Sequence, residues 1–361
     1  MCRWITAPLC LLGTLLAFST QAEPLQAIYS DWQVSCDNLN HCVARNSQDG
    51  QELVMKISRE AGPEGKSSVS IDYQRNSDEQ SADAPVAGRL QMNGKTLSFN
   101  HREWDVSKKH LSTNNRLVVN DFIAAIREGS AISLAGKADP AQPVPPVISL
   151  KGIKAALLAI DAQQGRVGTK TAWANRGTKP VNTVPPIPSA PVLPHFSEPQ
   201  ALTESEISAI TQNAATTIEN NDCSLDPSER EVHIFALSSD KALMTVNCDM
   251  GAYNLFALGF LVNRQAPYKM DDLALNMPFK LGEDEGSPEL INADFDPKTG
   301  TLSTYDKGRG IGDCGVSSRW IFDGKAFRLA AYSAPDRPSY KAPAGSPENP
   351  ARRGYTHPYR N

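Results

Sequence analysis

Residues 305–315 form the stretch of this sequence whose residue types could do chemistry. Its Gly308–Gly315 part holds four glycines, and Lys307, Arg309 and Asp313 lie beside or between them. Successive backbone N–H groups in such a turn can form a concave anion site, and the two cations would add positive charge. The phosphate motif G-x-G-x-x-G fails at Asp313, however, and no helix is expected after the loop. We favour a glycine loop shaped by a tight backbone next to a disulfide, with phosphate binding as the open alternative.

A binding site is expected where this loop meets a second segment of the same half of the chain. Its candidate residues are Tyr253, Asn254, Lys307, Arg309 and Asp313. Clustering of these side chains around one deep pocket would favour an enzyme, for example an envelope hydrolase. A filled core with the same side chains splayed at the surface would favour a binding module.

Other motifs match catalytic or metal-binding patterns, but the structure expected around them does not suit those functions. Ser238–Lys241 matches S-x-x-K and Lys298–Gly300 matches K-T-G, as in the penicillin-recognising serine enzymes. That serine must open a buried helix, whereas both matches fall in expected turns. Asp294 and Asp296 resemble a calcium loop, but its third acid, glycine and closing glutamate are absent. The six histidines show no ligand spacing, and we expect no catalytic residue, no metal and no cofactor.

Residues 1–22 have the pattern of a cleavable secretory signal peptide. Arg3 precedes an apolar run, and small residues at the end offer a cleavage site. We therefore expect an exported, periplasmic protein, in which cysteines form disulfides by default. Five cysteines follow the signal, which leaves one over. They are Cys36, Cys42, Cys223, Cys248 and Cys314.

The cysteines predict two bridges and one free thiol. Cys36 and Cys42 flank a turn-rich spacer between two strand-like runs. Cys223–Cys248 would tie the end of a helix to a strand, and it leaves Cys314 free to form a disulfide-linked dimer. The alternative is Cys248–Cys314 with Cys223 free, which would pin the glycine loop to residues 251–254.

The strand and helix patterns that must position these residues predict an α+β fold that is mostly β. Two antiparallel β-rich domains, each with one or two packing helices, are expected at 25–174 and 201–332, joined by a Pro-rich linker at 175–200. A tail at 333–361 has six prolines and no large aliphatic side chain, and we expect it to be disordered.

The pattern assigns the elements of each domain as follows. The first domain has strands at Ile28–Cys36, Cys42–Arg45, Leu53–Ile57, Val69–Tyr73, Arg89–Met92 and Thr96–Phe99, with helices at Asp121–Glu128 (cap Asn120) and Leu150–Gln164 (cap Ser149). The second has a helix from a capping box at Thr203–Glu206 to about Asn220, and strands at Glu231–Leu237, Ala242–Cys248, Tyr253–Val262, Leu290–Phe295, Thr301–Tyr305, Arg319–Phe322 and Ala326–Ala330. The latter is expected to be an antiparallel meander packed by one helix.

Composition bounds the function classes. The chain has 361 residues, 40% of them hydrophobic and 21% charged, which suits two globular domains. A net charge of −4 argues against nucleic-acid binding. No segment after the signal is apolar enough to predict a membrane span.

Two sets of motifs resemble known families. Asp31–Cys36 with Cys42 resembles the start of the invasion-associated locus B proteins. Residues 248–254, 299–303, 307–315, Trp320 and 323–324, with 149–152 and 164–169, resemble the family with a domain of unknown function 1176.

The second resemblance implies a periplasmic Gram-negative protein without an established activity. Members of that family look as if they close with a further cysteine and a Trp-Pro-x-x-Trp-Arg-like strand, and the tail here has neither. The resemblance thus implies that the missing cysteine serves Cys314 in those proteins.

We expect an exported binding or envelope-associated module that is not catalytic. Its partner would be an envelope or periplasmic protein or ligand that the sequence does not identify. The alternative is an envelope hydrolase, or another enzyme, with its site at the Lys307–Cys314 loop.

Overall fold

The computed structural model describes residues 24–46, 52–73, 85–135, 145–192, 195–278, 288–312 and 315–334. The expected signal peptide, the candidate residue Asp313, the expected free thiol Cys314 and the tail from residue 335 lie outside them. None of the helices in these ranges is long and apolar enough to cross a membrane.

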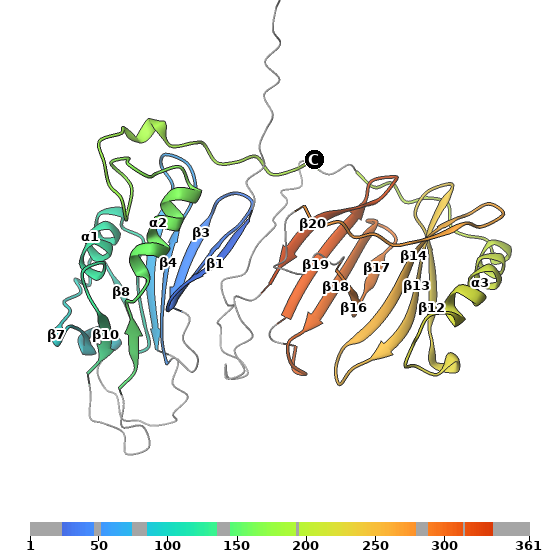
Figure 1. Cartoon of the computed structure of the whole chain (residues 1–361), viewed down its shortest axis with the longest axis horizontal. Coiled ribbons are helices and arrows are strands. Elements are labelled where there is room, and N and C mark those ends of the chain that lie inside the picture. The colour runs from blue at the N-terminus through green and yellow to red at the C-terminus, as the bar shows by residue number, and fades with distance from the viewer. Residues whose placement is uncertain are drawn as a thin grey trace, which may run out of the picture.

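Two antiparallel sheets make up the first half of the chain, drawn in blue to green in Figure 1. The larger has the strand order β1-β2-β3-β4-β5-β9-β8, and the smaller has β11-β10-β6-β7. The strands are β1 (Leu25–Tyr29), β2 (Trp32–Cys36), β3 (Cys42–Asn46), β4 (Leu53–Arg59), β5 (Ser67–Tyr73), β6 (Leu90–Met92), β7 (Lys95–Thr96), β8 (Asp105–Val106), β9 (His110–Thr113), β10 (Ala131–Leu134) and β11 (Val147–Ser149). A 3₁₀ turn, Val86–Arg89, precedes β6.

The hairpin β2–β3 carries the first expected disulfide. Cys36 and Cys42 lie directly opposite each other in the register, with their Cα atoms 4.0 Å apart, and they are bonded. Asp37 closes the turn between them, because its Oδ1 accepts hydrogen bonds from the amides of Leu39 and His41, each at 2.9 Å. The predicted Cys36–Cys42 bridge is confirmed.

The single strand predicted over Ile28–Cys36 is wrong. The chain turns back at Ser30-Asp31, so that Tyr29 pairs with Trp32 across a two-residue turn. Ser30 takes the left-handed conformation (φ 54°) that such a tight turn requires. The alternating pattern runs through both strands, which is why the sequence alone does not show the turn.

Two helices cover the first half, and both begin elsewhere than predicted. Helix α1 (Arg116–Ile126) is capped by Asn115, whose side chain accepts from two amides of the first turn, so the predicted cap at Asn120 is wrong. Helix α2 (Ile153–Gln163) begins after Gly152 (φ 95°), while the Ser149 hydroxyl accepts from the Lys151 amide, before the helix starts. A Cβ at Gly152 would lie 1.9 Å from the Tyr29 carbonyl oxygen, which is why the backbone there needs glycine.

One apolar core unites these elements. It includes Trp32 and Met55 from the large sheet, Ile132 from the small sheet, and Ile123 and Leu157 from the two helices. The indole of Trp32 also donates to the Ser149 carbonyl at 3.0 Å, which links the two sheets.

The second half holds one helix and two further antiparallel sheets, drawn in yellow to red in Figure 1. The helix is α3 (Glu204–Glu219), preceded by the 3₁₀ turn Val181–Thr183 and followed by Pro227–Glu229. The first sheet contains β12 (Val232–Ala236), β13 (Lys241–Met250), β14 (Leu255–Asn263), β15 (Met270–Asp272) and β16 (Leu290–Ile291). The second contains β17 (Asp294–Asp296), β18 (Thr301–Lys307), β19 (Gly315–Phe322) and β20 (Phe327–Ser333).

Consecutive strands are neighbours in both sheets, as the predicted meander requires, except that β16 pairs with β14 and not with β15. The meander is divided into two layers. Side chains on one face of β13, such as Met244 and Val246, pack under α3. Leu243 on the opposite face packs against Phe295 and Trp320 of the second sheet. Figure 1 shows the same order of layers. Because both faces are covered, five successive residues of β13 are buried.

The capping box of α3 is confirmed and carries an ion pair. The Thr203 hydroxyl accepts from the Glu206 amide, and the Glu206 carboxylate accepts from the Thr203 amide at 2.7 Å. Arg264, which is 8% exposed, donates its Nε to Glu206 at 3.0 Å. The Arg264 hydrogen bond lowers the pKa of Glu206 to about 2, with help from the Thr203 amide.

Much of the Pro-rich stretch lies against the first half. Thr169 and Lys179 form a parallel bridge, and Val184 is 3% exposed. Gly165 lies so close to Pro185 that a Cβ on it would be 2.7 Å from the proline ring. Further along, Phe196 belongs to the core of the second half. Only the residues between these anchors connect the halves.

Candidate functional site at two hairpin tips

The tip of the β13–β14 hairpin exposes two large side chains. Gly251 and Asn254 close the turn with an amide-to-carbonyl hydrogen bond of 2.8 Å. Met250 is 65% exposed and Tyr253 is 41% exposed. Neither side chain is needed for the core, so both are available to a partner.

Asn254 attaches this tip to the β18–β19 hairpin. Its Nδ2 donates to the Asp306 carboxylate at 2.8 Å and to the Lys307 carbonyl at 3.1 Å. Its Oδ1 accepts from the Lys307 amide at 3.0 Å. Because the Asn254 side chain binds both the amide and the carbonyl of Lys307, it fixes the distance between the two hairpins.

Asn292 completes the attachment from the corner between β16 and β17. Its Nδ2 donates to the Asn254 Oδ1 at 2.8 Å and to the Tyr305 carbonyl at 2.7 Å. Its Oδ1 accepts from the Leu255 amide at 3.1 Å, while its own amide donates to the Leu255 carbonyl at 2.8 Å. Asn292 has φ 44°, a conformation that asparagine tolerates better than most residues. We call Asn254 and Asn292 the asparagine pair.

The glycine-rich loop is closed from within. The Tyr305 hydroxyl donates to the Gly312 carbonyl at 2.7 Å, and the Gly312 amide donates to the Arg309 carbonyl at 2.9 Å. A Cβ at Gly315 would lie 2.1 Å from the Asp306 carbonyl oxygen, so a tight backbone demands that glycine, as predicted. The Gly312 and Lys307 amides are both used inside the protein, which weighs against the phosphate cradle.

The loop adds a third exposed apolar side chain beside the first tip. Ile311 is 62% exposed. The Tyr253 hydroxyl donates to the Gly308 carbonyl at 3.3 Å, and its ring lies 3.6 Å from where a Cβ of Gly310 would be. Residues 250–255 and 307–312 therefore form one surface, which we call the paired tips.

The second disulfide supports the same end of the sheet. Cys223 is bonded to Cys248 near the end of β13, as predicted. The Ser224 amide donates to the Asp249 carboxylate at 2.7 Å, and the Leu225 amide donates to the Cys248 carbonyl. The hydrogen bonds from Ser224 lower the pKa of Asp249.

Three of the five predicted site residues, Tyr253, Asn254 and Lys307, meet at the paired tips. Arg309 is in the same loop and accepts a hydrogen bond through its carbonyl, and Asp313 lies outside the described residues. Sequence reasoning missed Asn292, Met250 and Ile311. A lone asparagine after a short apolar run gives no signal that it will face Asn254.

The motifs set aside on their context are turns, as expected. The Ser238 hydroxyl donates to Asp240 at 2.7 Å and accepts from the Lys241 amide. The Lys298 amide donates to the Asp296 carboxylate at 2.9 Å. No group of His, Cys, Asp and Glu side chains with the geometry to hold a metal occurs within the described ranges.

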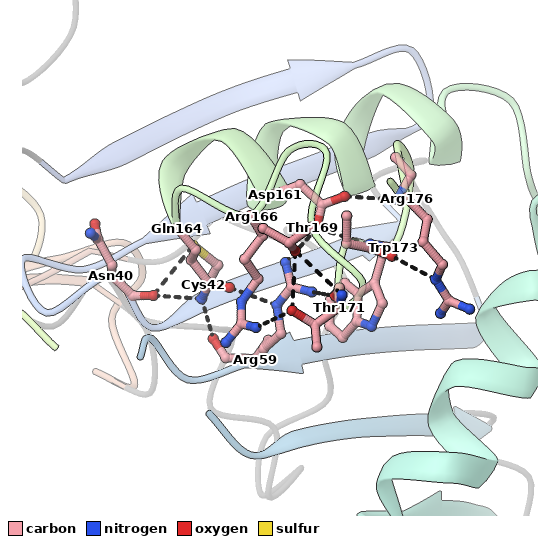
Figure 2. A network of polar contacts seen from close by, with 12 residues as sticks. Asn40, Cys42, Arg59, Asp161, Gln164, Arg166, Thr169, Thr171, Trp173 and Arg176 are labelled. Carbon is pink, nitrogen blue, oxygen red and sulfur yellow. Dashed lines mark hydrogen bonds and ion pairs between the residues drawn. The ribbon is translucent and has the colours of Figure 1, made fainter. Parts of the chain in front are cut away.

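A second polar network is buried in the first half, where Figure 2 shows it beneath α2. Arg59 donates to Asp161 at 2.7 Å and to the Gln164 side chain at 2.6 Å, and its guanidinium lies 3.8 Å from the Trp173 ring centre. Asp161 also accepts from the amides of Trp173 and Ala174, at 3.0 and 2.7 Å.

This network holds the segment that follows α2, not a ligand. Asp161 is 0% exposed and Arg59 is 3% exposed, so no solute reaches them. Burial lowers the pKa of Arg59 to about 10, against the opposing effect of Asp161. Arg166, also buried, donates to the Gly62 carbonyl and to Thr171. Burial lowers the pKa of Arg166 too, and the negative charge of Asp161 opposes this effect.

Comparison with known proteins gives a family. The model of the proteins of unknown function called DUF1176 matches residues 26–338. The chain belongs to this family. The uncharacterized protein YpfG of Escherichia coli (strain K12) is 40% identical over 314 residues, which cover 87% of this chain and 88% of the relative. No solved structure matches. The match includes both the paired tips and the buried network, so the resemblance noted from the motifs is confirmed for this family.

Proposed function

We propose that the chain is an exported, non-catalytic binding module of the bacterial envelope that holds its partner on the paired tips. The observation that carries the proposal is the exposure of Met250, Tyr253 and Ile311 on hairpins that the asparagine pair locks together. These are three of the ten large apolar side chains exposed in the described residues, and they lie together. Tyrosine and methionine are enriched in interfaces.

The state of the polar groups favours binding over hydrolysis at this loop. A hydrolase would need polar groups that are free to act on a substrate. Both polar ends of the Asn254 side chain, and the amides of Lys307 and Gly312, are instead engaged in holding the loop. A surface held rigid before binding loses little entropy when a partner binds.

Two disulfides indicate a non-cytoplasmic protein, because such bonds persist in oxidising compartments. The periplasmic location and the cleavage after Ala22 are part of the proposal and are supported by the pattern of residues 1–22. The similarity of Asp31–Cys42 to invasion-associated locus B proteins stays a prediction.

Capture from periplasmic extract tests the binding surface. The mature protein is immobilised as wild type, as the double variant Met250→Ser/Ile311→Ser, and as the control Leu117→Ser. The Leu117 side chain is 73% exposed, about as much as those of Met250 and Ile311, but it lies on α1 in the first half of the chain. We expect the wild type and the control to retain the same protein or ligand, and the double variant to retain at least tenfold less. Equal retention by all three would contradict the proposed surface.

A separate experiment tests export and cleavage of the signal peptide. The protein expressed with residues 1–22 should be recovered from the periplasm with an intact mass that begins at Glu23. Recovery of the unprocessed chain in the cytoplasm would remove the export part of the proposal and leave the surface to the capture experiment.

A further inference from the structure

The last described strand ends beside the paired tips. Ser333 of β20 lies opposite Ser317 of β19, and Ser317 lies opposite Tyr305 of β18. Neighbouring strands are about 4.8 Å apart, so Ser333 is about 10 Å from Tyr305, which closes the glycine loop. Whatever follows Ala334 leaves the sheet at the edge of the proposed binding surface.

A polar group at this exit has no hydrogen-bond partner among the described residues. The Ser333 hydroxyl is buried and makes no hydrogen bond within the described structure. A buried hydroxyl without a partner is unfavourable, because it has lost its hydrogen bonds to water. A segment that crosses this end of the sheet could supply the missing hydrogen bond.

An acidic surface borders the paired tips on the side of the second disulfide. We call it the acidic rim, and its members are Asp222, Asp226, Glu229, Glu231 and Asp249, with Arg230 as the one cation among residues 222–231. The segment 222–231 is held beside the end of β13, because the Ser224 amide donates to the Asp249 carboxylate and the Leu225 amide donates to the Cys248 carbonyl. The backbone hydrogen bond from Ser228 lowers the pKa of Asp226, so this carboxylate is ionised at neutral pH.

Residues 335–361 have the composition that such a surface would bind. They contain five cations against two acids, together with three tyrosines and six prolines. Cations complement the rim, and tyrosine rings fit beside exposed methionine and isoleucine. Proline limits the freedom of the unbound segment, which lowers the entropy cost of binding.

We propose that residues 335–361 bind in cis across the paired tips and the acidic rim, as a built-in competitor of the external partner. Lys341 is seven residues beyond Ala334 and can reach about 23 Å from it. The competition rests on the proposed function, whereas the cis contact itself does not.

Zero-length carbodiimide cross-linking of the full mature chain tests the contact, because it joins a lysine amine to a carboxylate in direct contact. Lys341 is the one lysine in residues 335–361. In the monomer band we expect Lys341 linked to a carboxylate of the acidic rim. Lys341→Arg should abolish the link, and 0.5 M NaCl should reduce it severalfold by screening. Met250→Ser/Ile311→Ser should reduce it at least threefold.

Lys325 is the matched control, since it stands in the turn at the opposite end of β20 and should give no link to the rim. The proposal is overturned if Lys341 gives no link, or links equally well to acids of the first half such as Glu128. Links found only in a dimer band would overturn the cis arrangement and assign the segment to a second copy.

The competition is measured separately by capture. A variant with the five cations of residues 335–361 changed to Gln should retain at least threefold more partner than the wild type. Unchanged retention with the cross-link intact would overturn the competition alone. If the wild type captures nothing while the cross-link forms, the proposed function fails and the cis contact stands.

Discussion

The buried network around Asp161 and the asparagine pair at the tips solve the same problem with different chemistry. Each fastens a loop to a distant part of the chain through side chains that bind backbone groups. The first uses charges in the core, where Asp161 pairs with Arg59 and its charge also acts on Arg166. The second uses neutral amides near solvent and leaves apolar side chains exposed beside it. Loss of one partner of a buried ion pair lowers the unfolding free energy strongly. Neutral amides near the surface contribute less to stability, and the surface that they hold stays accessible to a partner.

Asp161→Ala should give the largest loss. It leaves Arg59 buried without its ion-pair partner and removes the attraction of Asp161 on Arg166. We expect the first half to lose about 3–5 kcal/mol of unfolding free energy. Urea unfolding measures this. The control Glu128→Ala breaks an exposed pair with Lys154 and should cost under about 0.5 kcal/mol.

The same variant also tests whether the halves fold independently, as the proposed domains at 25–174 and 201–332 require. Limited proteolysis of Asp161→Ala should degrade the first half and leave a stable fragment that contains residues 201–332. Loss of both halves together would contradict independent domains.

Asn254→Ala should have an intermediate effect of about 1–3 kcal/mol, because the Lys307 amide and the Asn292 side chain lose their acceptor. Hydrogen exchange at the Lys307 amide should become faster while that of β13 stays slow. Asn221→Ala, which removes one exposed hydrogen bond to Thr217, is the matched control and should change little. An Asn254 variant as stable as this control would show that the pair does not hold the tips.

Acid should weaken the second half through Glu206. Its pKa is about 2 in the folded protein against 4.5 ordinarily, so the unfolded chain binds the proton more readily. The stabilisation is complete above pH 4.5 and is lost as the pH falls toward 2. Because the Glu206 side chain is 21% exposed, we expect on the order of 1 kcal/mol. Glu206→Gln should flatten the decline between pH 4.5 and 2, and an equal decline in both proteins would assign it to other carboxylates.

Met250→Ser/Ile311→Ser should have the smallest effect on stability, within about 0.5 kcal/mol of the wild type, since neither side chain is in a core. Thermal unfolding checks this. A large loss would mean that the exposed side chains of the tips support the fold, as the buried network around Asp161 does.

Local signals in the sequence were sufficient where one short segment decides the structure. The capping box at Thr203–Glu206 and the Cys36–Cys42 hairpin both depend on neighbours within a few residues, and both are confirmed. The helix caps at Asn120 and Ser149 were wrong because a better-placed start, at Asn115 or Gly152, competes within a few residues of each.

Contacts between distant segments were beyond the sequence. Arg59 and Asp161 are 102 residues apart in the sequence. The hydrophobic pattern around each of them does not show that the charged side chain is buried. Asn254 and Asn292 are 38 residues apart and meet only because two separate sheets bring their corners together. The loop was identified from its glycines, and Tyr253 and Asn254 were expected beside it, but the role of Asn292 in attaching the loop came only with the fold.

The anchoring of the Pro-rich stretch at both ends shortens the tether between the halves. With Val184 and Ile187 against the first half and Phe196 in the second core, about eight residues remain in place of the twenty-six expected. Fully extended, they span at most about 28 Å. A partner that touches both halves would thus meet the second contact at an effective concentration in the millimolar range, and weak contacts on each would add into firm attachment.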